Sequence, residues 1–259
     1  MTNTLSHPHR TPLHPTVSVI TVCWNAQETI EDTIQSVITQ SYHHIEYIVI
    51  DGDSSDGTLS IIRRYGERIA KVVSEPDHGL YDAMNKGLRL ATGDYVCFLN
   101  AGDCFHEDDT LQQMMHRLYE EGKDTLPDVI YGETELVDSE GHFVRMRRLS
   151  TPEQLNWKSF RHGMVVCHQA FLAKRELAPQ YDTRYRFSAD FDWCIRVMKQ
   201  SKWLFNTHLT LIDYLNEGMT TRNHRASLWE RFHIMRHHYG LFTTLLMHGW
   251  FVVRAVWKK

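Results

Sequence analysis

Short apolar runs and helix-like apolar periods alternate along the first hundred residues. Four runs rich in Val, Ile, Tyr and Phe predict strands, and they span residues 17–24, 45–50, 70–74 and 95–99. Apolar positions three and four apart predict helices between these strands, over residues 28–39, 58–65 and 80–91. Strand–helix repeats of this length predict a parallel sheet with right-handed crossovers and flanking helices. The first half is therefore predicted to be an α/β unit of the nucleotide-binding type.

The second half of the chain has a less regular pattern. Strands are predicted at residues 128–131, 142–147 and 163–167 and, around a bend, at 203–215, with a helix at 190–199. No linker rich in Pro, Gly or Ser separates the two halves, so residues 16–220 are predicted to form one domain. Residues 1–15 carry three prolines and no apolar run, which predicts a disordered segment without a secretory signal.

The composition places the chain among ordinary globular proteins. Its 259 residues are 42% hydrophobic and 23% charged, which excludes disorder over most of the length. The five cysteines are odd in number and show no CxxC spacing, so they indicate buried thiols in a reducing cytosol. The histidines show no metal-binding spacing such as HExxH.

Charge divides the chain into an acidic body and a basic tail. The formal net charge is −4, but residues 221–259 alone carry +6 and the remainder −10. This distribution argues against a general nucleic-acid binder and indicates that the tail meets an anionic partner. The tail is also predicted to form amphipathic helices with Trp and Phe, which suits peripheral contact with a membrane. A helix packed on the domain fits the same pattern equally well.

Acidic residues stand where an open parallel sheet binds its ligands, beyond the carboxyl ends of the strands. Asp51 follows the second predicted strand in DGDSSDGT, and Asp103 follows the fourth in NAGD. Asp190 comes much later, in SADFDW. Turns and helix caps use the same residue types, and that alternative stays open for each position.

The NAGD loop has the donors that a hard divalent cation prefers. Asn100 offers an amide oxygen and Asp103 a carboxylate, and both flank a glycine at a strand end. Such a cation also takes phosphate oxygens as ligands. A plain β-turn accounts for the same residues, but two neighbouring acidic strand-end loops favour a ligand site.

These segments together resemble a known family. SVITVCWN and IEYIVIDGDSSDGT are similar to the opening of family 2 glycosyltransferases of the GT-A fold. SEPDHGLYDAMNKGLRLATGDYVCFLNAGD resembles the bacterial exopolysaccharide branch, the colanic-acid transferase-like enzymes. The resemblance covers residues 17–220 and is densest over 17–110. It implies a GT-A fold, with a mostly parallel nucleotide-binding sheet flanked by helices and followed by the helical tail.

The resemblance also implies roles for individual residues. Asp51 matches the residue that holds the nucleotide base, and Asp103 matches the last acid of the metal motif, which binds Mg²⁺ or Mn²⁺ across the donor diphosphate. Asp190 matches the catalytic base. The sequence departs from the family pattern at Gly52 and Ala189, where many members carry acids.

Three further positions complete the implied donor site. Asn100 replaces the first acid of the metal motif and is expected to act as a weaker ligand or as a contact to the donor sugar. Asn85 and Lys86 lie on the helix that lines the donor pocket, and Lys86 is expected to approach a phosphate. An i,i+4 surface pair of Lys86 with Asp82 is the alternative.

The implied activity is that of an inverting, hexosyltransferase-type enzyme. It would transfer a sugar from a UDP- or GDP-linked donor to a glycan, lipid-linked at the cytoplasmic face of the cell membrane, in cell-surface polysaccharide biosynthesis. Two alternatives remain, a non-catalytic nucleotide-sugar-binding partner of another transferase and a nucleotidyltransferase. The latter usually has an early Gly-rich, basic phosphate loop, whereas residues 22–27 contain neither Gly nor Lys.

Overall fold

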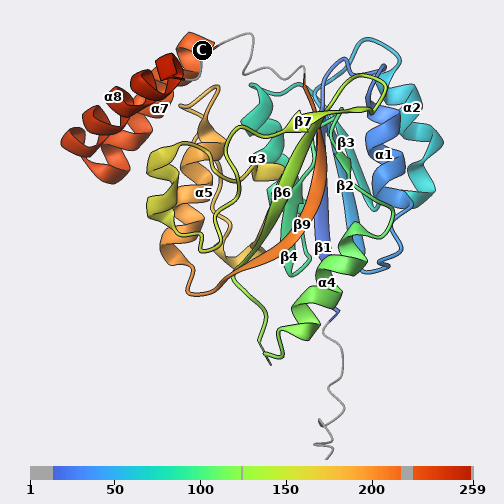
Figure 1. Cartoon of the computed structure of the whole chain (residues 1–259). Helices are drawn as coiled ribbons and strands as arrows, with labels where there is room; N and C mark the ends of the chain where they lie inside the picture. The colour runs from blue at the N-terminus through green and yellow to red at the C-terminus, as the bar shows by residue number, and fades with distance from the viewer. Residues whose placement is uncertain (1–13, 124, 217–223, 258–259) are drawn as a thin grey trace, which may run out of the picture.

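The computed structural model describes residues 14–123, 125–216 and 224–257. The predicted disordered segment therefore lies outside the described residues except for His14 and Pro15. The described parts form one mixed sheet with helices on both faces (Figure 1).

The predicted parallel sheet of the first half is confirmed. β1 pairs in parallel with β2 on one side and with β4 on the other, and β3 extends the sheet beyond β2. These strands are β1 Val17–Cys23, β2 Ile45–Asp51, β3 Lys71–Ser74 and β4 Tyr95–Phe98. Every residue of β1 is buried, as its uninterrupted apolar run predicted. The carboxyl ends of these strands therefore open at a common edge.

The second half of the chain continues the same sheet with antiparallel pairs. β4 pairs with β8, β8 with β6, and β6 with the long strand β9 in parallel, while β5 and β7 add to β9 and β6. These strands are β5 Cys104–Phe105, β6 Val129–Val137, β7 Phe143–Met146, β8 Phe171–Lys174 and β9 Leu204–Leu215. A single sheet thus joins both halves.

Helices cover the two faces of the sheet with separate apolar layers. One layer includes residues of α3, α5 and α7, and the other includes residues of α1, α2 and α4. The helices are α1 Ile30–Ile38, α2 Thr58–Arg64, α3 Leu80–Leu90, α4 Thr110–Glu120, α5 Ala189–Gln200, α7 His224–Tyr239 and α8 Leu241–Trp257. Short 3₁₀ turns are η1 Gly66–Arg68, η2 Trp157–His162, η3 His168–Ala170 and η4 Arg175–Leu177.

The structure differs from the sequence-based prediction at two of the predicted strands. Residues 163–167 are not a strand; they form irregular chain between η2 and η3, and their apolar side chains pack in the core without joining a ladder. The sheet position next to β4 is taken instead by β8, four residues later. The predicted bend within 203–215 is a local irregularity of one strand, because His208 has φ 57° and the β6–β9 register shifts around Glu133.

The tail helix α7 packs on the domain. Ile234 and Met235 are buried in the core layer beside α5. The Glu230 carboxylate accepts hydrogen bonds from the backbone N–H groups of Arg186 and Phe187 at 2.8 Å each. Packing on the domain therefore accounts for one face of the predicted amphipathic tail.

The last helix, α8, contacts α7 and leaves much of its apolar surface exposed. Phe242, Leu246 and Trp250 are 82%, 64% and 53% exposed, and their spacing of four places them on one side of the helix. Among the described ranges of the chain, no helix combines the length and hydropathy needed to span a membrane.

Candidate functional site

Asp51 ends β2 and holds the loop that follows it. Its buried carboxylate accepts hydrogen bonds from the Ser54 hydroxyl at 2.5 Å, the Ser54 N–H at 3.1 Å and the Ser74 hydroxyl at 2.7 Å. Both oxygens thus already have protein partners. The DGDSSDG loop is fixed in place by the side chain that precedes it, so Asp51 shapes the edge where the base was expected to bind.

Gly52, the departure from the family pattern, lies against Asp77. A Cβ built on Gly52 would come 2.4 Å from Oδ2 of Asp77 and 3.5 Å from the Trp24 ring. Asp77 therefore fills the space that a second acid of the loop would need. Asp77 belongs to the SEPD segment that follows β3. An acidic side chain therefore still lies at this position, but the segment after β3 supplies it and the loop after β2 does not.

Asp103 lies buried at the end of the NAGD loop. Its Oδ2 accepts a 2.7 Å hydrogen bond from the Gln169 amide, and its Oδ1 accepts one of 3.2 Å from the Leu215 N–H. Burial raises the pKa of the Asp103 carboxyl to about 7, although these two hydrogen bonds oppose the shift. A cation at this carboxylate would have to replace or share the Gln169 amide.

Asn100 has a free acceptor at the same strand end. Its Oδ1 is buried and has no hydrogen-bond partner among the residues that the structure describes. Buried amide oxygens normally have a partner, so this one is available to accept a hydrogen bond from water or from a ligand. An amide oxygen of this kind can accept a sugar hydroxyl or coordinate a divalent cation.

Asp190 lies in the first turn of α5, with Ser188 as the N-cap residue. Its Oδ1 accepts a 2.9 Å hydrogen bond from the Tyr81 hydroxyl, and its Oδ2 lies 3.4 Å from Nδ1 of His168. Its carboxylate thus joins α3, η3 and α5 and does not cap its own helix. The alternative that Asp190 is an N-cap is excluded by this geometry.

The surroundings keep Asp190 ionised. Burial alone would raise the pKa of its carboxyl, but the contact with His168, the charge of Arg231 and the Tyr81 hydrogen bond together lower it below the ordinary value. Conversely, burial and the nearby Asp190 charge raise the pKa of the Tyr81 hydroxyl well above 10. The pair therefore consists of a carboxylate that accepts and a phenol that donates at neutral pH.

Consecutive residues connect the two acids. His168 contacts Asp190, and Gln169 donates to Asp103. His168 also presents a buried Nε2 with no partner in the described part of the chain. The strand-end acid and the helix-start acid therefore lie on either side of one dipeptide in η3.

Asn85 and Lys86 lie on α3 but face different surroundings. The Asn85 amide donates to the Tyr181 carbonyl at 3.0 Å and accepts from the Tyr181 N–H at 2.7 Å, so both of its polar atoms hold a neighbouring loop. Lys86 donates to the Pro76 carbonyl at 2.7 Å and pairs with Glu75 at 3.0 Å. The alternative pairing of Lys86 with Asp82 is wrong, because Asp82 instead accepts from the His78 N–H.

Several residues of this centre could not be selected from sequence alone. They are Asp77, Tyr81, His168, Gln169 and Arg231. His168 and Gln169 had one signal, the family resemblance, which implies a place near the acceptor side for this pair, but a hydrogen-bonded histidine at a strand end explained it equally well. Arg231 belongs to the tail, where its charge had been assigned to a surface; in the structure its Nε is buried and its guanidinium lies 5.8 Å from the Phe191 ring centroid.

Comparison with known proteins identifies the family. The sequence profile described as Glycosyl transferase family 2 matches residues 18–181. An uncharacterized glycosyltransferase of Mycobacterium tuberculosis is 34% identical over 188 residues, which cover 70% of this chain and 68% of the relative. The chain belongs to glycosyltransferase family 2. A second relative is the amylovoran biosynthesis glycosyltransferase AmsB of Erwinia amylovora. This chain is 32% identical to AmsB over 196 residues, which cover 70% of this chain and 64% of AmsB.

Solved structures confirm the GT-A-like fold of this family 2 glycosyltransferase. TarS 1–349 of S. aureus in complex with UDP-GlcNAc superposes with a TM-score of 0.66 at 18% identity, covering 85% of this chain and 64% of TarS. The mannosyltransferase PcManGT from Pyrobaculum calidifontis, in complex with GDP-Man and Mn²⁺, superposes with a TM-score of 0.58 at 19% identity. This match covers 94% of this chain and 78% of PcManGT. This chain thus spans slightly less than two thirds of that TarS chain.

Proposed function

We propose that this family 2 glycosyltransferase transfers a sugar from a nucleotide-sugar donor to a glycan acceptor with inversion at the anomeric carbon. The observation that carries the proposal is the Asp190 carboxylate. It is held ionised by Tyr81, His168 and Arg231, next to the dipeptide that holds the strand-end acid. One ionised carboxylate facing the acceptor is what a single-displacement transfer requires.

The acceptor side of the reaction follows from Asp190. The carboxylate takes the proton of the acceptor hydroxyl while the acceptor oxygen attacks the anomeric carbon. The bond from that carbon to the donor phosphate breaks, and the nucleoside diphosphate leaves with the bonding electrons. The Tyr81 hydroxyl and the His168 imidazole hold the carboxylate in place during the proton transfer.

The donor side is assigned to the strand-end residues. Asp51 and its loop would receive the nucleotide base, together with the adjacent Asp77. Lys86 on α3 would line the donor pocket and would need to exchange Glu75 for a donor phosphate. Asn85, whose amide is engaged by the Tyr181 backbone, would contribute to the pocket by holding that neighbouring loop. The proposed donor is a UDP- or GDP-linked sugar.

A divalent cation, Mg²⁺ or Mn²⁺, fits the NAGD loop. The unpartnered Asn100 Oδ1 and the Asp103 carboxylate would hold it. When bound, such an ion neutralises the charge that develops on the departing diphosphate.

The proposed transfer is tested with a panel of UDP- and GDP-sugars, by measuring nucleotide release and the anomeric configuration of the product by NMR. We expect one donor class to be turned over and the product to have the opposite configuration at the anomeric carbon. Retained configuration would contradict the role of Asp190, and nucleotide binding without turnover of any donor would favour a non-catalytic partner.

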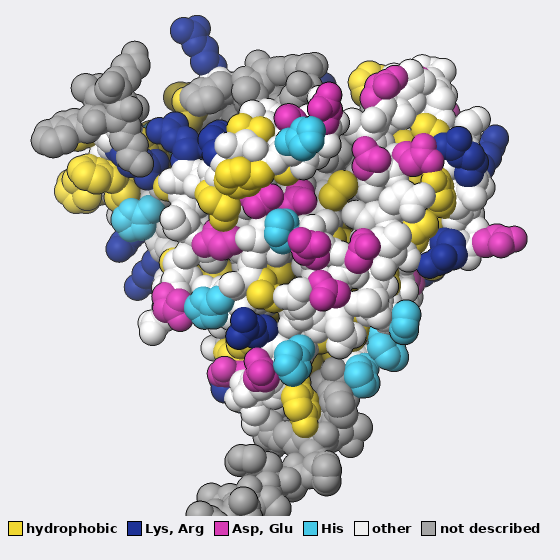
Figure 2. Space-filling view, turned by 45° about the vertical axis from the view of Figure 1, so that its right-hand side comes forward, with side chains coloured by type: hydrophobic (Ala, Val, Ile, Leu, Met, Phe, Trp, Pro, Cys, Tyr) yellow, Lys and Arg dark blue, Asp and Glu magenta, His cyan; other side chains and the backbone are white. Residues whose placement is uncertain are grey.

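We also propose a lipid-linked acceptor at the cytoplasmic face of the cell membrane, within cell-surface polysaccharide biosynthesis. α8 supports this assignment, because its Phe242, Leu246 and Trp250 side chains are exposed. The helix belongs to the basic tail, residues 221–259, whose net charge is +6. Apolar insertion and basic charge act together in interfacial binding to anionic lipids. Acidic side chains spread over the centre of the face in Figure 2, whereas Lys and Arg lie mostly towards its edges. An anionic leaflet would therefore orient the protein with its tail towards the lipid.

Replacing Phe242, Leu246 and Trp250 together by serine should abolish sedimentation with anionic vesicles. The fold should be retained because all three side chains are exposed. Wild-type binding should weaken as salt is raised, since about 1 kcal/mol per basic residue near the surface is electrostatic. These point variants are preferable to deletion of the tail, because α7 supplies Ile234 and Met235 to the core.

The matched control for vesicle binding replaces Phe143 and Met146, which are exposed on β7, by serine. This variant should sediment with vesicles like the wild type. Binding that is unchanged in the α8 variant, or insensitive to salt in the wild type, would contradict the membrane assignment.

A further inference from the structure

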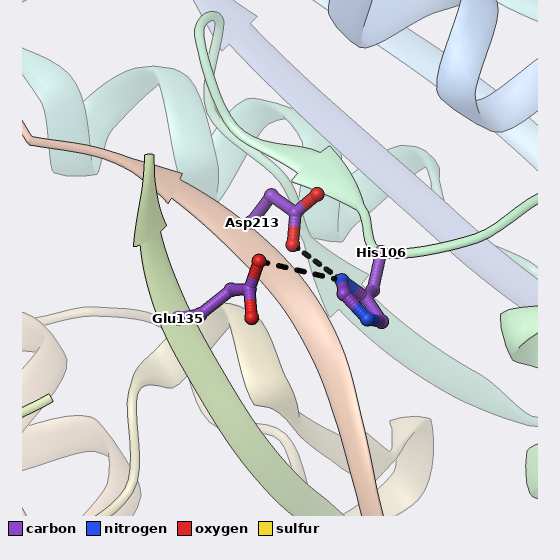
Figure 3. Close-up of side chains that lie close together, drawn as sticks. All are labelled: His106, Glu135 and Asp213. Carbon is purple, nitrogen blue, oxygen red and sulfur yellow. Dashed lines mark hydrogen bonds and ion pairs between the residues drawn. The ribbon is translucent and has the colours of Figure 1, made fainter. Parts of the chain in front are cut away.

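A second polar cluster lies away from Asp103 and Asp190. His106 follows β5, Glu135 lies on β6 and Asp213 lies on β9. Nδ1 of His106 is 2.7 Å from Oδ1 of Asp213 and 3.8 Å from Oε1 of Glu135. Figure 3 shows the Glu135 and Asp213 side chains on their two strands and the His106 side chain just beyond β5 converging on one point. One atom from each residue lies within 4.8 Å of the others.

The cluster is distinct from the donor site, although it shares two strands with it. Burial raises the pKa of the Tyr214 hydroxyl, and the charges of Asp103 and Asp190 raise it further, so Tyr214 lies on the side of the sheet near those acids. Side chains alternate along a strand, and Asp213 therefore points to the other face of β9. Its cluster uses none of the residues assigned to the transfer reaction.

The cluster carries more negative charge than the protein compensates. Glu135 and Asp213 are direct partners in the β6–β9 ladder, where like charges destabilise a sheet. Within the described part of the chain neither carboxylate pairs with a Lys or Arg, and Glu107 adds a further negative charge nearby. Burial, together with these neighbouring charges, raises the pKa of both carboxyls. A bound cation would offset this excess.

We infer that His106, Glu135 and Asp213 bind a divalent transition-metal ion. One imidazole nitrogen and two carboxylate oxygens are a ligand set for Zn²⁺ or Mn²⁺, whereas Mg²⁺ prefers oxygen ligands alone. Tetrahedral ligands at about 2.1 Å from zinc lie roughly 3.4 Å apart. The His106–Asp213 and His106–Glu135 separations, 2.7 and 3.8 Å, lie on either side of this value, and all three ligand atoms lie within 4.8 Å of one another. Side-chain movements alone would therefore bring them to an ion.

The chemistry of binding leaves the imidazole neutral. Nδ1 of His106 would give up its hydrogen bond to Asp213 and coordinate the ion with its lone pair. The Nδ1 proton either passes to Nε2 or, where Nε2 is already protonated, is released to solvent, so the bound imidazole carries one proton, on Nε2. The cluster is partly open to solvent, with His106, Glu135 and Asp213 side chains 31%, 16% and 20% exposed, so the ion has a path of entry.

The position of the cluster gives the ion a structural role. His106 comes three residues after Asp103. Asp213 comes two residues before Leu215, whose N–H donates a hydrogen bond to the Asp103 carboxylate. An ion bound here would tie β5, β6 and β9 together on both sides of the NAGD loop. It would stiffen the segment that carries Asp103 without contacting the donor.

The test uses full-length protein treated with EDTA, without nucleotide, so that a donor-dependent metal does not contribute. Titration calorimetry with Zn²⁺ and Mn²⁺ should show one site per chain, and thermal denaturation should show an increase in Tm; Mg²⁺ should give a much smaller response. His106→Gln and Asp213→Asn should weaken binding by at least about tenfold. Co²⁺ should give visible absorption bands in the wild type that His106→Gln removes.

Two matched variants separate this site from weaker ones. His142 lies 3.7 and 3.5 Å from two carboxylates, Asp138 and Glu140, on an exposed turn, so His142→Ala should leave binding unchanged. Glu135→Gln should raise the Tm of the metal-free protein, because it removes a like charge, and should abolish the metal-induced increase. Absence of stoichiometric binding in the wild type, or binding that survives His106→Gln and Glu135→Gln, would overturn the inference.

Discussion

Replacing Asp190 with asparagine should lower the turnover number by at least about 100-fold, the range for loss of a general base. Asparagine retains the size of the side chain and can still accept the hydrogen bond from Tyr81, but it cannot take a proton from the acceptor. Donor affinity should change little, because Asp190 is assigned to the acceptor side. The measurement is steady-state kinetics together with calorimetric titration of the nucleotide.

Asp192 provides the control on the same helix. Its carboxylate binds Arg196 at 2.6 Å and His238 at 2.7 Å, so it links α5 to α7. Asp192→Asn should lower the Tm while turnover at low temperature stays within a few fold of the wild type. Wild-type turnover in Asp190→Asn, or an equal loss in Asp192→Asn, would reduce Asp190 to a structural residue.

Replacing Asp103 with asparagine should have opposite effects on activity and on stability. Metal-stimulated transfer should fall about 100-fold or more, because the carboxylate is assigned to hold a cation against the diphosphate. The fold should become more stable at pH 8, because the buried charge is removed. The amide oxygen of the new side chain can still accept from the Leu215 N–H, and the Gln169 amide turns over so that its oxygen accepts from the new Nδ2–H. A gain in Tm on the order of a few °C is expected.

The raised pKa of Asp103 also predicts how the stability of the fold changes with pH. Burial raises the pKa of Asp103 from 3.8 to about 7 in the folded protein. Between these values the folded state binds the extra proton, so wild-type stability falls as the pH rises through the window and is constant above it. The advantage of Asp103→Asn should therefore be largest at pH 8 and absent near pH 4. A variant with near-wild-type turnover and the same Mn²⁺ response would contradict the metal assignment.

The sequence was sufficient to predict the parallel half of the sheet, because each buried strand is a continuous apolar run and each helix has a clear period. It also placed Asp51, Asp103 and Asp190 near strand or helix ends, since those positions follow from local patterns. It failed at residues 163–167, where an apolar run serves packing between irregular segments. Burial alone does not reveal whether a segment pairs in a ladder.

The partners of the acids were harder to predict because they come from far along the chain. Asp103 meets Gln169 across 66 positions, and Tyr81 meets Asp190 across 109. The same holds for His106 and Asp213, which are 107 positions apart and share no motif. Only the folded sheet brings such residues together.

The tail shows how charge and packing can share one pattern. Its basic residues predicted a contact with an anionic surface, yet the charge of Arg231 reaches Asp190 and Arg236 lies at a cavity between α7 and α5. A sequence period identifies the face that is apolar but does not identify what covers it.

The dipeptide His168–Gln169 has a consequence for how this enzyme can diversify. Asp103 is assigned to the donor and Asp190 to the acceptor, and consecutive residues of one short turn contact them. The turn therefore sets the distance between the two acids, and with it the distance between the two substrates. We expect a substitution that displaces this turn to displace both acids. Evolution of new sugar or acceptor preferences should therefore proceed by remodelling the surrounding loops, with the spacing between the two acids inherited unchanged.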